Sequence, residues 1–107
     1  FAAHIRYMRQ LYRSRRDVLL AEVREKLGHF ATPAPATGGL QLSVWLPPGQ
    51  EAALSRQARR LGILTPGLKA QYQTAQAQRD GWLLGFSALT PGEIRSAVER
   101  LARIAVA

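Results

Sequence analysis

The chain has 107 residues, 47% of them hydrophobic, with a net charge of +8 and no cysteine. This length and composition suit one domain with a single hydrophobic core. The lack of cysteine excludes a disulfide framework, a thiol nucleophile and a thiolate metal site. No apolar run approaches the ~18 residues of a membrane span, and the charged N-terminal stretch has no signal-peptide shape. We therefore expect a cytoplasmic protein with no membrane partner.

The first predicted element is a long helix over residues 4–27, ended by a left-handed cap at Gly28. One face of this helix is apolar, and its members are Ile5, Met8, Tyr12, Leu19, Val23 and Leu27. Arginines form a separate stripe at helical spacing, whereas Arg15 falls on the edge of the apolar face. A domain of ~100 residues does not need so long a helix for its own core. Its first half is therefore expected to pack on something outside this chain, which begins at Phe1 and is expected to be part of a longer protein.

Four segments are candidates for short strands. Residues 40–46 alternate apolar and polar side chains, as in a strand buried on one face. The proline-containing stretch 31–37 allows at most a short edge strand, and 63–66 is predicted to be another short strand. The apolar run 82–86 suits a central strand buried on both faces. Gly85 within it indicates a close approach by a neighbouring element or a ligand.

Two shorter helices complete the prediction. One begins near Glu51 and ends at a Gly62 cap, and the other begins with a capping box formed by Thr90 and Glu93. The core face of the last helix is formed by Ile94, Val98, Leu101 and Ala105. Its solvent face carries Arg95, Glu99 and Arg103, which are spaced for i, i+4 ion pairs. Residues 69–80 are predicted to form a loop. The fold class is α+β, with a small three- to four-stranded sheet covered by helices mainly on one face.

The positive charge is spread along the chain. Residues 1–30 carry seven basic and three acidic groups, and the remaining residues carry eight and four. Clustered arginine would favour a basic nucleic-acid-binding module. An even distribution favours solvated helix faces and a docking surface for an acidic neighbour. The nucleic-acid module stays an alternative.

The residues offer no complete active site. His4 and His29 are far apart and have no carboxylate at ligand spacing, so no metal site is expected. Neither lysine follows a glycine-rich turn that could hold a phosphate. Gly85-Phe86-Ser87 only loosely matches a nucleophile elbow, because the second glycine is replaced by Leu89. We expect no catalytic residue in this chain.

Four segments together resemble the C-terminal part of a MocR-type transcription regulator of the GntR superfamily. They are HIRYMRQLYRSRRDVLL, GGLQLSVWLP, LGILTP and LLGFSALTPGEIRSAVERLA. Such regulators join an N-terminal winged helix-turn-helix to a body resembling a fold-type I, pyridoxal-phosphate-dependent aminotransferase. The first segment is fairly specific to these regulators, whereas the later ones are shared with many aminotransferases of classes I and II.

The resemblance implies that residues 1–107 form one small C-terminal domain of the aminotransferase-like body, entered through 4–27 as the interdomain helix. It implies pyridoxal phosphate in the large domain of the parent protein and none in this fragment. The implied partners are that missing large domain, a homodimer partner, an amino-acid-like effector, and DNA bound through a missing winged helix. No activity is expected from the fragment alone. The alternative on the same fold is the small domain of a true aminotransferase.

The resemblance also assigns candidate site residues. His4, Arg15 and Arg16 would face the large domain or the dimer partner, and a buried Arg15 would need a carboxylate or carbonyl supplied there. The alternative is that Arg15 only lays its stem along the apolar face. Aminotransferases carry a carboxylate-binding arginine in a late strand of the small domain, and that position falls on Leu83. Leu83 cannot bind a carboxylate, and Arg79 is the nearby candidate to replace the arginine. The alternative is that Arg79 is a solvated loop arginine.

Overall fold

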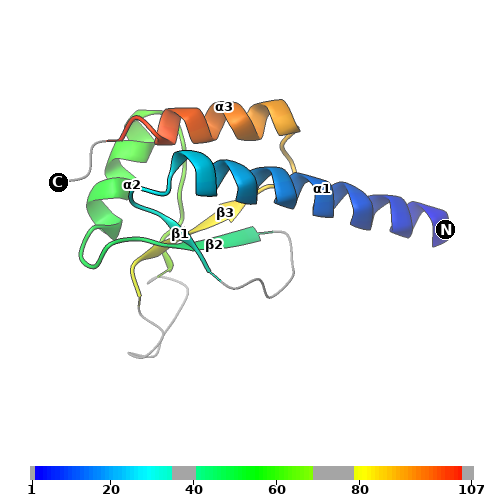
Figure 1. The fold of residues 1–107 in the computed structure, drawn as a ribbon, viewed down its shortest axis with the longest axis horizontal. Helices are drawn as coiled ribbons and strands as arrows, with labels where there is room; N and C mark the ends of the chain where they lie inside the picture. Colours follow the sequence, from blue (N-terminus) through cyan, green and yellow to red (C-terminus); the bar gives the residue numbers. More distant parts are fainter. Residues whose placement is uncertain (1, 35–40, 69–78, 105–107) are drawn as a thin grey trace.

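Three helices and three strands form an α+β fold in a computed structural model that describes residues 2–34, 41–68 and 79–104. In chain order they are α1 (Ala2–Lys26), β1 (Thr32–Pro33), β2 (Gln41–Trp45), α2 (Glu51–Arg60), β3 (Gly81–Gly85) and α3 (Pro91–Leu101). Figure 1 shows α1 and α3 side by side over one face of the sheet, with α2 at one end. The predicted fold class is confirmed.

The sheet is antiparallel and has the order β1-β2-β3. The alternation predicted for 40–46 is confirmed from residue 41 onward by β2, in which Leu42 and Val44 are buried, followed by the buried Leu46. Leu40 lies outside the described residues. β1 is the short edge strand that proline permits. Ser43 lies opposite Leu83 at the centre of the β2–β3 pair. The sheet therefore has a core face and an outer face, and the latter carries Ser43, Trp45 and Leu83.

The strand predicted over 63–66 is wrong. This segment is irregular, and beyond it only an isolated bridge joins Gly67 to Trp82. Pro66 has no N–H to donate, but its carbonyl accepts a hydrogen bond from the Leu83 N–H at 2.8 Å. The described sheet therefore has three strands, because proline prevents the segment from completing a ladder. The loop predicted over 69–80 lies mostly outside the described residues, as does Ala105.

The expectation that 82–86 is buried on both faces is also wrong. Trp82, Leu84 and Phe86 point into the core, whereas Leu83 is half-buried and Gly85 is exposed. Helices cover only one face of the sheet, so the strand alternates. A Cβ at Gly85 would meet nothing within 4 Å, and no described element presses on it. The close approach occurs at Gly81 instead, where a Cβ would collide with Leu68 and a backbone oxygen.

The core lies between the sheet and the three helices. Trp82 is fully buried there, packs edge-on against Phe30 with ring centroids 5.9 Å apart, and donates its indole N–H to the Ser55 hydroxyl at 2.9 Å. The helices supply the buried residues Leu19, Val23, Leu54, Ala58, Ile94, Val98 and Leu101. These positions recur at helical spacing, so the apolar periodicity correctly predicted which helix faces are buried.

Of the two predicted glycine caps, one is confirmed. Gly62 has φ +81° and donates its N–H to Arg59 O, while the Ile63 N–H reaches Ala58 O, a Schellman motif. Gly28 does not adopt a positive φ. Instead the chain continues in a tight turn in which the Ala31 N–H donates to Leu27 O at 2.7 Å. That turn satisfies the Leu27 carbonyl without a left-handed residue.

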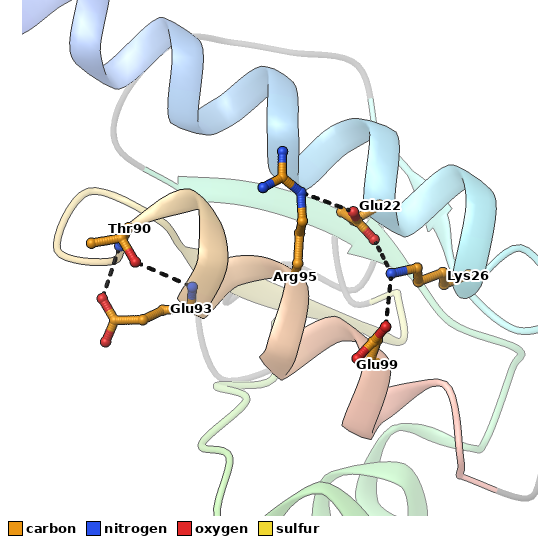
Figure 2. Close-up of polar contacts among 6 residues, drawn as sticks. All are labelled: Glu22, Lys26, Thr90, Glu93, Arg95 and Glu99. Carbon is orange, nitrogen blue, oxygen red and sulfur yellow. Dashed lines mark hydrogen bonds and ion pairs between the residues drawn. The ribbon is translucent and has the colours of Figure 1, made fainter.

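The capping box at the start of α3 is confirmed. Thr90 Oγ1 accepts from the Glu93 N–H at 3.2 Å, and Glu93 Oε1 accepts from the Thr90 N–H at 2.9 Å (Figure 2). The hydrogen bond from the Thr90 backbone is the main cause that lowers the pKa of the Glu93 carboxyl. The charged form of Glu93 is therefore part of the cap.

The solvent-facing charges of α3 do not pair in the predicted way. Arg95 and Glu99 lie against α1, where Arg95 Nε is 3.5 Å from Glu22 and Glu99 is 3.5 Å from Lys26 (Figure 2). Lys26 also lies 2.7 Å from Glu22, and this contact is the main cause that raises the pKa of the Lys26 ammonium. The pair Glu22–Lys26 is an i, i+4 pair within α1, whereas Arg95 and Glu99 of α3 find partners on α1 in place of the i, i+4 partners predicted within α3.

Candidate functional site: the first half of α1 and the outer sheet face

The first half of α1 contributes no fully buried residue to the core, although Tyr12 packs partly against it. Only Leu19 and Val23 are buried within this helix of 25 residues, and both lie in its second half. Ile5 is 37% exposed and Tyr7 is 59% exposed. Figure 1 shows this half extending beyond the sheet and α3. An apolar surface of this kind on a projecting helix indicates a contact surface.

Arg15 connects α1 to the end of β3. Its Nη1 donates a hydrogen bond to the carbonyl oxygen of Ser87, which lies two residues beyond the strand. Its Nε is buried and has no hydrogen-bond partner among the described residues. The chain itself therefore supplies one partner for the Arg15 guanidinium, whereas the Nε–H donor has none. A buried donor without an acceptor is costly, so the second partner expected from a neighbouring domain stays a prediction.

The outer face of the sheet brings together the two candidates from the β3 region. Leu83 is half-buried at the centre of β3, and the guanidinium carbon of Arg79 lies 4.3 Å from the centre of the Trp45 ring. Trp45 pairs with Gly81, one position along the face from the Ser43–Leu83 pair. Arg79 is thus held by a cation–π contact near Leu83. The face offers an apolar centre with one cation at its side.

The other candidates have no such partners. His4 is exposed in the first turn of α1, and Arg16 is half-buried. Within the described parts of the chain, neither forms a hydrogen bond or an ion pair. The structure thus brings Arg15 to β3 and Arg79 to the outer face, but it does not bring His4 and Arg16 to either.

A polar junction that the sequence analysis missed fixes the start of β3. Asp80 Oδ2 accepts from the Glu51 N–H at 2.9 Å, and Glu51 Oε1 accepts from the Gly81 N–H at 3.0 Å. Asp80 is buried and caps α2 from a distant part of the chain. The only signal in the sequence is an aspartate directly before a buried apolar run. The junction sets where β3, with Leu83, begins relative to α2.

An open cleft of about 340 Å³ lies between the end of α2 and the face of α3. Its walls include the exposed Leu64, together with Leu89, Glu93 and Arg100. None of the predicted site residues lines it. The cleft therefore adds no support to the predicted site.

Lys26 is the one lysine among the described residues, and it is paired with Glu22. A lysine that forms a Schiff base needs a lowered pKa, whereas the pKa of Lys26 is raised by its contact with Glu22. Lys69 lies outside the described residues. No cluster of metal-ligating side chains occurs in 2–34, 41–68 or 79–104. Among those residues, no helix combines the length and apolar character that crossing a bilayer requires.

Comparisons with known structures identify the fold. An α-aminoadipate aminotransferase, LysN, from Thermus thermophilus superposes on 96% of this chain with a TM-score of 0.83 and 21% identity. A kynurenine aminotransferase from Pyrococcus horikoshii superposes on 94% with a TM-score of 0.78 and 25% identity. The chain covers 26% and 25% of these two proteins. The fold is therefore that of part of a fold-type I aminotransferase body.

Sequence comparisons point to regulators. The chain is 31% identical over 100 residues to an uncharacterized HTH-type transcriptional regulator, YdeL, of Bacillus subtilis, and 29% identical over 102 residues to a protein of Rhizobium meliloti named "Probable rhizopine catabolism regulatory protein MocR". These matches cover 92% and 94% of the chain. No family model matches.

The chain spans about a fifth of the length of these curated relatives. Sequence and fold together match a C-terminal fragment of an aminotransferase-like regulator of the MocR type. The resemblance stated from the sequence is confirmed.

Proposed function

We propose that this chain is the small domain of the effector-responsive body of a pyridoxal-phosphate-dependent transcription regulator. The observation that carries the proposal is that both regulator relatives match more than nine-tenths of the chain, while its fold is that of aminotransferases. In this proposal residues 1–107 form one domain, and α1 is the interdomain helix. The parent would bind DNA through a winged helix and act as a homodimer. The cofactor and its lysine would belong to the large domain.

The contact between Arg15 and Ser87 supports a specific role for α1. Arg15 lies at the middle of α1, where the projecting half begins, and its guanidinium donates to the Ser87 carbonyl two residues beyond β3. A shift of α1 relative to the large domain would therefore act directly on the strand that carries Leu83. Arg15 is a positioning residue in this proposal, because it acts through β3. His4 and Arg16 would contact the large domain or the dimer partner.

Leu83 supports an effector whose recognition differs from that of ordinary aminotransferase substrates. A leucine side chain offers no donor to a carboxylate. Arg79, stacked on Trp45, is the nearby cation that could bind the acidic group of an amino-acid-like effector. The cation–π contact leaves the N–H groups at the guanidinium edge available. The alternative function, a true aminotransferase, would require Arg79 to replace the missing arginine.

The test uses the intact protein that contains this chain. Its absorbance should reveal bound pyridoxal phosphate, and its affinity for DNA should change when an amino-acid-like effector is added. Arg15→Gln should weaken that effector dependence about tenfold while retaining bound cofactor and effector-free DNA binding. Arg24→Gln is the matched control, because Arg24 is exposed in the second half of α1.

Unchanged effector dependence in Arg15→Gln would refute the role of Arg15. Bound cofactor with turnover of amino acids and no DNA binding would favour the aminotransferase. An intact protein without bound cofactor would refute both the regulator and the aminotransferase functions.

A further inference from the structure

The outward face of α2 is formed by arginines. Arg56, Arg59 and Arg60 are all exposed and lie opposite the buried Leu54 and Ala58. Their i, i+3, i+4 spacing makes them neighbours on the helix surface. The only acidic residue of α2 is Glu51 at its first turn, which hydrogen-bonds to Gly81. This face therefore has no negative charge of its own.

Two more exposed arginines lie at the end of α3 and just beyond it. Arg100 Nη1 donates to Leu61 O at 3.4 Å, directly after α2, so the C-terminal ends of the two helices meet there (Figure 1). Arg103 follows one turn further along and is also exposed. The arginine cluster is the set Arg56, Arg59, Arg60, Arg100 and Arg103.

The arginine cluster forms no ion pair within the described residues. Two helix C-termini carry a partial charge of about −0.5 each, so they offset about one of the five positive charges. Most of the positive charge of the cluster is therefore available to an external partner. The fold brings the end of α3 to the end of α2, so arginines that are about 40 positions apart in the sequence come together.

We propose that the arginine cluster binds the phosphate backbone of duplex DNA beside the operator. The proposal rests on the proposed function, in which the parent protein binds DNA. Arginine forks match phosphate oxygens, and contacts of this kind position a protein on the duplex without reading sequence. A protein partner would call for large apolar or aromatic side chains at the centre of the surface. The outward face of α2 itself adds only Ala52 to its arginines, and the large exposed Leu64 lies outside this face, in the cleft beside Arg100.

The experiment measures DNA binding by the intact protein on two duplexes. The first holds only the operator core, recovered by selection from a random duplex pool, and the second extends it by two helical turns on each side. The test variant is Arg56→Gln/Arg59→Gln/Arg60→Gln. The control is the matching triple lysine variant, which keeps the charge. Thermal unfolding of each variant checks that the fold is retained.

The glutamine variant should bind the extended duplex about tenfold more weakly, with a log–log salt slope reduced by ~2 to 3, since each lost phosphate contact removes ~0.9. Binding to the core duplex should not change, and the lysine variant should keep most of the affinity. If the triple variant does not fold, Arg56→Gln alone should reduce the slope by ~1.

Equal binding of the extended duplex by the wild type and the glutamine variant would overturn the proposal. So would a loss confined to association with another protein. If the wild type binds DNA only without sequence preference, and the glutamine variant loses that binding, the regulator function fails while the DNA-binding surface stands. If the wild type binds no DNA at all, both fail.

Discussion

At the scale of single residues, the carboxylates of Asp80 and Glu51 fix the position of β3, which forms part of the outer sheet face. Asp80 and Glu51 each accept a backbone N–H from the segment of the other, so the start of α2 and the start of β3 are fixed together. Asp80 is buried. Removing its carboxylate would therefore leave a helix-terminal N–H without an acceptor.

We predict that Asp80→Ala lowers the free energy of unfolding by about 1 to 2 kcal/mol. Asp80→Asn is the control, because it keeps an oxygen acceptor and loses only the charge, so its loss should be smaller. Urea denaturation measures both. Equal losses in the two variants would show that the charge, and not the acceptor, matters.

Several residue-level features were predictable and others were not. Thr90 and Glu93 form a contiguous motif, so the sequence alone predicted their hydrogen bonds. Gly81 and Asp80 depend on Leu68 and Glu51, which are distant in the sequence. The close backbone approach was therefore predicted at the wrong glycine, Gly85. Whether Leu83 and Arg79 contact an effector stays a prediction.

At the scale of elements, α3 is defined at its start by the capping box and along its length by contacts with α1. Glu22 and Lys26 meet Arg95 and Glu99 across the two helices (Figure 2). Periodicity predicted all three helices correctly because one buried face is a local signal. It could not predict which charges pair, since the partners come from the other helix.

Thr90→Ala should destabilise the protein by about 1 kcal/mol, because the Glu93 N–H loses its acceptor. Thr90→Ser, which keeps the hydroxyl oxygen, is the control and should cost less. Thermal or urea unfolding gives both values. A neutral Thr90→Ala variant would contradict a stabilising role for the cap.

The stabilisation by Glu93 should depend on pH. The pKa of this carboxyl is lowered in the folded state, so its contribution is complete above the ordinary glutamate pKa of 4.5 and is lost as the pH falls through the folded value. We predict that Glu93→Gln is less stable than the wild type at neutral pH, and that the difference shrinks in acid. A difference that grows in acid would contradict this assignment.

At the scale of the whole molecule, the domain is elongated, with extents of 48 × 32 × 21 Å. The projecting half of α1 contributes to this length (Figure 1). The length of the predicted helix indicated that its first half packs on a partner outside this chain. The sequence could not predict that Arg15 would find one of its partners, Ser87, within the same chain, because that contact spans 72 positions.

We predict that amides in the first half of α1, before Arg15, exchange on the order of tenfold faster than those around Val23 when this chain is studied alone. Helical hydrogen bonds without tertiary packing open readily. Hydrogen exchange followed by NMR measures the difference. Addition of the large domain should remove it. Uniform protection along α1 in the isolated chain would contradict the prediction.

The edges of the small sheet have a consequence for solubility. Unpaired strand edges are templates for aggregation. At one edge, β1 contains Pro33 and is only two residues long. At the other, two N–H groups of β3 are already bonded, that of Gly81 to Glu51 and that of Leu83 to Pro66. Edge-to-edge pairing of the sheets of two copies, as in a fibril, is therefore disfavoured at both edges.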